Sequence, residues 1–62
     1  MAVTILESAD NGRIALQEGT LTDGSKVYNV FVRGGELPCR NKEIATSLYA
    51  QLVDMVENFD II

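Results

Sequence analysis

Apolar residues recur at spacings of three and four between Asn41 and Phe59, a pattern that predicts one long amphipathic helix. Asn41 is expected to cap its N-terminus, because the side-chain oxygen can accept a hydrogen bond from a free first-turn amide. Neither Gly nor Pro interrupts the segment, so the helix should be continuous. The apolar positions are Ile44, Ala45, Leu48, Tyr49, Leu52, Met55, Val56 and Phe59.

Three shorter segments precede the helix and predict strands, and the third of them is rich in β-branched and aromatic residues. They are separated by two turn signals in which Asn, Asp and Gly tolerate positive φ. The expected strands are Met1–Glu7, Arg13–Leu21 and Lys26–Arg33, with turns at Asp10-Asn11-Gly12 and Thr22-Asp23-Gly24-Ser25.

Gly34-Gly35 is expected to end the third strand, and residues 36–40 to form a connector holding the only proline, Pro38. The chain of 62 residues is therefore interpreted as one small domain of the α+β class. The expected architecture is a three-stranded antiparallel β-meander followed by a C-terminal helix packed on one face.

The second hairpin allows two registers. Counting from a two-residue turn at Asp23-Gly24 would pair Leu16 with Phe31 and mix the two faces of the sheet. A bulge at Gly19 would instead pair Leu16 with Val30, and this is the register we expect.

In that register Ile14 pairs with Val32, and the helix covers the face that they share. Val27 and Phe31 then lie on the opposite face, for which this chain offers no second layer. That face is either solvated or an interface, so both residues are candidate partner-binding positions.

The composition excludes several classes of function. There is no histidine, and the single cysteine, Cys39, can form neither an internal disulfide nor a Cys–His nucleophilic pair. No motif for a metal, cofactor or phosphate is present, so we expect a protein without catalytic activity, metal or cofactor. We interpret Cys39 as a reduced, small apolar residue.

The net charge of −4 argues against direct nucleic-acid binding. The apolar runs are too short for a membrane span, and the N-terminus lacks the pattern of a signal peptide. A cytoplasmic location is expected. The basic residues Arg33, Arg40 and Lys42 surround one loop and form a candidate anion site. The favoured interpretation of this loop is a plain connector between strand and helix.

The C-terminal end of the helix breaks a local rule. Asp54, Glu57 and Asp60 place negative charge where the helix dipole is already negative, and no Lys or Arg follows Lys42. Such an acidic end is either a solvated surface that favours solubility or a binding patch for a partner.

The wide apolar face of the helix raises the possibility of a symmetric dimer. The residues available for such an interface are Leu48, Tyr49, Leu52, Met55 and Phe59. Coverage of the whole face by the sheet is the simpler interpretation.

These observations favour a non-enzymatic protein–protein interaction module or small acidic inhibitor that binds a larger, basic or nucleic-acid-handling protein. A viral (phage) or mobile-element accessory protein that blocks a host defence or nucleic-acid enzyme would have such a composition. A self-associating structural homodimer is the first alternative. A small-ligand or nucleic-acid binder that uses the Arg33–Lys42 loop is the second.

Overall fold

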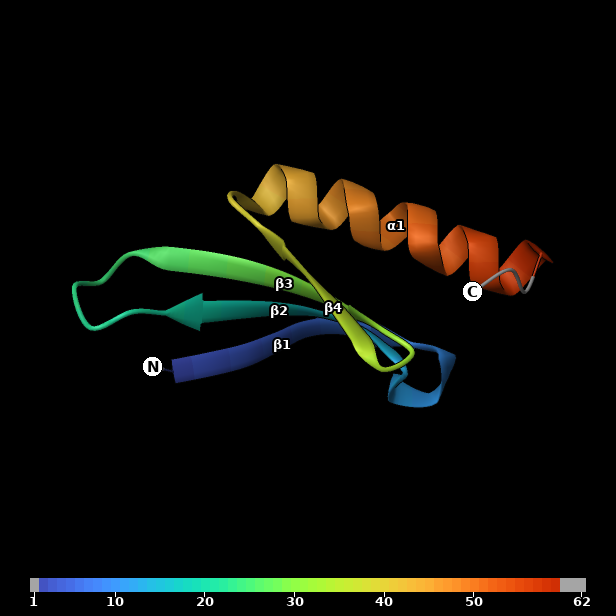
Figure 1. Ribbon diagram of the computed structural model, residues 1–62, viewed down its shortest axis with the longest axis horizontal. Coiled ribbons are helices and arrows are strands. Elements are labelled where there is room, and N and C mark those ends of the chain that lie inside the picture. Colours follow the sequence, from blue (N-terminus) through green and yellow to red (C-terminus); the bar gives the residue numbers. More distant parts are fainter. Residues whose placement is uncertain (1, 60–62) are drawn as a thin grey trace.

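The computed structural model describes residues 2–59, which form one antiparallel sheet and one helix packed against it (Figure 1). The strands are β1 (Ala2–Ala9), β2 (Ile14–Thr20), β3 (Lys26–Val32) and β4 (Gly35–Cys39), and the helix is α1 (Lys42–Phe59). Spatial order follows sequence order, β1-β2-β3-β4. The predicted α+β class is confirmed.

The predicted number of strands is wrong, because the expected connector after Gly34-Gly35 is strand β4. Arg33 (φ 39°) and Gly34 (φ 94°) both have positive φ, as a two-residue type I′ hairpin turn requires. This turn sends the chain back along β3, so that Val32 pairs with Gly35. Pro38 is tolerated because β4 is an edge strand, where a missing N–H costs no ladder hydrogen bond.

The expected register of β2 and β3 is confirmed: Leu16 pairs with Val30 and Ile14 with Val32. The predicted cause is wrong, since the pairing passes Gly19 without a bulge. The extra residue lies in the turn, where Gly24 (φ 89°) donates its N–H to the Leu21 carbonyl at 3.0 Å. A glycine with positive φ after a tight turn is the usual geometry of a three-residue hairpin loop.

A bulge does occur in β1. Ile5 pairs with Gln17, and the next paired residue is Glu7 with Leu16, so Leu6 is the additional residue. The β1–β2 turn that follows has positive φ at Asp10, Asn11 and Gly12 (54°, 56° and 82°).

The side chain of Arg33 ties this turn to the β3–β4 turn. Its Nε donates to Asp10 Oδ2 at 2.9 Å, and the bridge is largely shielded from solvent. Both turns therefore lie at one end of the sheet.

The helix begins as predicted. Asn41 Oδ1 accepts a hydrogen bond from the Ile44 N–H at 2.8 Å, which satisfies one of the free amides of the first turn. The core forms between α1 and the inner strands, with Ile14, Leu16 and Val30 almost completely buried. The helical contribution to this core is Ala45, Tyr49 and Val56.

The buried face of α1 is rotated about the helix axis relative to the predicted apolar face. Ile44 remains 53% exposed and Phe59 66% exposed, although the spacing placed both on the apolar face. Leu48, Leu52 and Met55 are half-buried along the margin of the contact. The helix therefore turns Ala45, Tyr49 and Val56 towards the sheet and leaves Ile44 and Phe59 at solvent.

Candidate protein-binding surface

The face of the sheet that α1 does not cover is called the open face. Cross-strand pairing assigns its residues, since directly opposed residues share a face and the side chains alternate along each strand. The open face is built by Val3, Ile5 and Ser8 of β1, Ala15, Gln17 and Gly19 of β2, Val27, Asn29 and Phe31 of β3, and Glu36 and Pro38 of β4.

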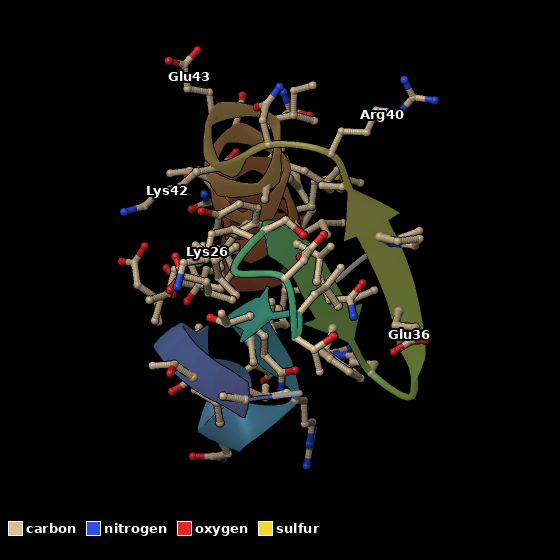
Figure 2. The ribbon with its side chains drawn as sticks, turned by 90° about the vertical axis from the view of Figure 1, so that its left-hand side faces the viewer. Lys26, Glu36, Arg40, Lys42 and Glu43 are labelled. Carbon is tan, nitrogen blue, oxygen red and sulfur yellow. The ribbon has the colours of Figure 1, made fainter. Side chains whose placement is uncertain are left out.

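The open face is apolar and almost free of charge. Among residues 2–59, its only ionisable strand residue is Glu36, on the edge strand β4 and labelled in Figure 2. Val3, Ile5 and Val27 are 53%, 61% and 37% exposed, and Phe31 is half-buried. No second layer covers them among residues 2–59. Several exposed apolar side chains on one uncharged surface of a small domain are typical of an interaction site.

The middle strand gives the open face its relief. Ala15 and Gly19 on β2 carry little or no side chain, whereas larger residues rise on the strands at either side. A small hollow therefore forms over Gly19, lined by Val3, Gln17, Val27 and Asn29. The two amide side chains can donate and accept hydrogen bonds there, so the surface combines apolar contact with a few polar groups that can orient a partner.

The opposite face has a different character where it extends beyond the helix. Tyr28 Oη donates to Glu18 Oε2 at 3.1 Å, and Lys26 Nζ donates to Thr20 Oγ1 at 2.7 Å. Partial burial raises the pKa of the Tyr28 phenol, and the neighbouring Glu18 carboxylate raises it further. These polar groups satisfy one another on the surface of the hairpin.

Val27 and Phe31 lie on the open face, as their predicted register requires. The acidic residues Asp54 and Glu57 are exposed on α1, and Asp54 accepts a hydrogen bond from the Asn58 amide. Neither carboxylate forms an ion pair with another residue in the range 2–59. Asp60, the third predicted acid, lies outside the described residues.

The three basic residues predicted to surround one loop are not brought together. Arg33 lies in the β3–β4 turn and is bound to Asp10, whereas Arg40 and Lys42 follow the far end of β4. Figure 2 shows the Arg40 and Lys42 side chains pointing to opposite sides of the chain. This arrangement gives no convergent anion site.

The predicted dimer surface on the helix is also divided. Tyr49 is 8% exposed and belongs to the core of its own chain, so it is not available to a partner. Burial raises the pKa of its phenol, and the negative charges of Glu7 and Glu57 raise it further. Phe59 is exposed, and Leu48, Leu52 and Met55 offer only their outer edges.

Cys39 ends β4, packs against the core cluster and directs its thiol to the Leu37 carbonyl at 3.7 Å. This position agrees with the interpretation of Cys39 as a small apolar residue. Within residues 2–59, no group of three or more His, Cys, Asp or Glu side chains is placed to hold a metal ion. No helix within residues 2–59 is long and apolar enough to cross a membrane.

Comparisons with protein-family models, with curated proteins and with solved structures found no match to this chain.

Sequence reasoning missed Val3 and Ile5, the two most exposed large hydrophobic residues of the open face. Their alternation with Thr4 indicates that they share a face, but not which one. The bulge at Leu6 shifts the face assignment between the two halves of β1, and nothing local in the sequence marks it.

Proposed function

We propose that this chain is a non-catalytic protein-binding module that uses its open face to dock on a larger protein. The observation that carries the proposal is the uncovered sheet surface with exposed Val3, Ile5 and Val27 and no charge at its centre. A folded domain gains nothing from presenting such a surface to water. Burial of this surface against a partner would remove its apolar side chains from water, as in the apolar part of a typical protein–protein interface.

The relief of the open face favours a protein rather than a small molecule as the partner. The hollow over Gly19 is small and flanked by Val3 and Val27, so it suits one protruding side chain of a complementary surface. Small-molecule sites are deeper and enclose most of the ligand.

The acidic groups have a different role in this proposal. Asp54 and Glu57 are exposed on α1, and this helix packs on the face of the sheet opposite the open face (Figure 1). They would act at long range, by steering the chain towards a basic partner such as a nucleic-acid-handling protein. An inhibitor that covers a functional surface of that protein fits this arrangement.

The test begins with capture of a partner from the source cells, followed by reconstitution from the two purified proteins and calorimetry. Val27→Lys places a charge beside the hollow of the open face and should weaken binding by at least about tenfold. The matched variant Asp54→Lys/Glu57→Lys should mainly slow association, by an amount that shrinks as salt is raised. Circular dichroism checks that both variants are folded.

The opposite pattern would contradict the proposal. If Val27→Lys binds as tightly as the unmodified chain while the helix variant loses the partner, the docking site is the acidic end of α1 and not the open face.

A further inference from the structure

The two edges of the sheet differ in their readiness to pair with another strand. β4 is short, five residues, and contains Pro38, which lacks an N–H. β1 is eight residues long, and no strand of the described chain pairs with its outer side. Figure 2 shows the two edges on opposite sides of the sheet, with the helix above the inner strands.

Within β1, the segment from Ala2 to Leu6 has the properties of a pairing template. It carries no charged side chain, and Val3, Thr4 and Ile5 are β-branched residues that favour strands. Ala2 to Ile5 keep regular pairing with β2, and the bulge at Leu6 ends this regular stretch. A lysine, a proline and a bulge are devices that usually protect an edge, and none of them occurs between Ala2 and Ile5.

The segment is also symmetric about Thr4. Val3 and Ile5 flank it as β-branched aliphatic residues, and Ala2 and Leu6 flank these as apolar residues. In an antiparallel pair of two identical strands centred on Thr4, each Val3 would lie opposite the Ile5 of the other copy. A two-fold axis requires such self-complementarity, because the same surface serves both copies.

We propose that β1 pairs antiparallel with β1 of a second copy of this chain, centred on Thr4, which joins two sheets into one of eight strands. Aliphatic pairs of Val3 with Ile5 form on the open face, where both side chains are more than half exposed in the single chain. No like charges face each other between Ala2 and Leu6. The open faces of the two copies become continuous.

Pairing of this kind suits the size of the chain. Only seven hydrophobic residues of the described part are buried, and a domain of this length is marginal when it folds alone. Pairing satisfies backbone groups along β1 and adds apolar contact without any change in the fold. Because about five residues of each copy take part, the interface is small and we expect a Kd in the micromolar range.

Sedimentation equilibrium from about 1 µM to about 1 mM should show a shift from one chain to two, that is, from 6.8 kDa to twice this mass. Val3→Lys/Ile5→Lys sets lysines opposite each other and should leave a monomer. Val3→Lys/Ile5→Glu sets each lysine opposite a glutamate and should restore the dimer. A chain that stays monomeric over the whole range, or a lysine variant that still dimerises, would overturn the proposal.

Disulfide trapping tests the register without disturbing the edge. In a Cys39→Ala background, Thr4→Cys should form an intermolecular disulfide, because residues opposite each other in an antiparallel pair have Cα atoms about 4.5–5.5 Å apart. The matched Ala2→Cys should not, because the two positions would lie four residues, about 13 Å, apart along the strands. Trapping at Ala2 and not at Thr4 would refute this register.

The same experiments separate this inference from the proposed function. Val27 lies on β3, away from the β1 edge, so Val27→Lys should lose the partner protein and keep the dimer. If the chain dimerises but binds no partner protein, the pairing of β1 stands and the proposed function is wrong. If the chain stays monomeric and binds a partner through the open face, the proposed function stands and the pairing of β1 is wrong. If the monomer instead captures an extended peptide of another protein on β1, the second copy is the wrong occupant.

Discussion

The division of β3 between a covered and an open face predicts very different costs for the same substitution at two nearby positions. Val30 is completely buried under α1, whereas Val27 is 37% exposed on the open face. Both lie within β3, so the loss of β-propensity on changing Val to Ala is common to the two and cancels in the comparison. What differs is burial.

Val30→Ala removes two methyl groups from the core, which costs about 1.6 kcal/mol of transfer free energy at about 0.8 kcal/mol per group. The resulting cavity, of roughly 50 Å³, adds about 1 kcal/mol at about 24 cal/mol per Å³. At Val27 about two thirds of the transfer free energy is lost, about 1 kcal/mol, and water fills the space. We therefore expect Val30→Ala to cost about 2–3 kcal/mol and Val27→Ala about 1 kcal/mol.

Urea unfolding followed by circular dichroism of the helix measures both free energies. A domain of 62 residues is expected to have a stability of about 3–9 kcal/mol, so the Val30 variant loses a large share of it. With an m-value of about 1 kcal/mol/M, its midpoint should fall by about 2–3 M, and that of the Val27 variant by about 1 M. Equal shifts, or a larger shift for Val27→Ala, would refute the assignment of the two faces.

Three further predictions concern the turns, the helix and the tyrosines. Asn41→Ala removes the cap on the Ile44 N–H and should lower the unfolding free energy by about 1 kcal/mol, measured by urea unfolding. Gly34→Ala should cost about 1–2 kcal/mol because φ is 94° there, although nothing crowds the added Cβ. Gly35→Ala is its matched control: its Cβ would meet only the Val32 carbonyl oxygen at an ordinary 3.6 Å, so equal losses at the two glycines would contradict the turn assignment. Tyr28 and Tyr49 have raised pKa values, so absorbance at alkaline pH should show both phenols ionising above their ordinary value of 10. A pKa that is higher in the folded chain stabilises the fold at pH values below the pKa of the unfolded chain, and this stabilisation should be lost as the pH rises through the folded pKa. Ordinary pKa values for both phenols would refute the argument from burial.

The strands and helix that local patterns encode strongly were predictable. The period of three and four from Ile44 to Val56 belongs to a helix whatever surrounds it, and Asn41 caps it through atoms only three residues away. The alternation in β2 and β3 likewise placed Val27 and Phe31 on the face opposite the helix. These two apolar residues of the candidate surface were therefore predictable from the sequence.

Strand β4 and the separation of the basic residues were not predictable from the sequence. Strand β4 contains a glycine and a proline, both poor strand formers, and it exists because the Arg33-Gly34 turn returns the chain to the free edge of β3. The basic residues looked adjacent along the chain, yet β4 separates Arg33 from Arg40 by its whole length. Residues that are close in sequence are therefore not close in space when a strand lies between them.

The sequence by itself thus determined the α+β class, the helix with its N-terminal cap, and the pairing of β2 with β3, because each depends on hydrogen bonds and side-chain periods within a short stretch. The tertiary structure decided which arc of the helix is buried, where the extra residues of β1 and the second hairpin lie, and which edge of the sheet is free. These features depend on how much surface one element can cover on another, and that quantity exists only once the chain has folded.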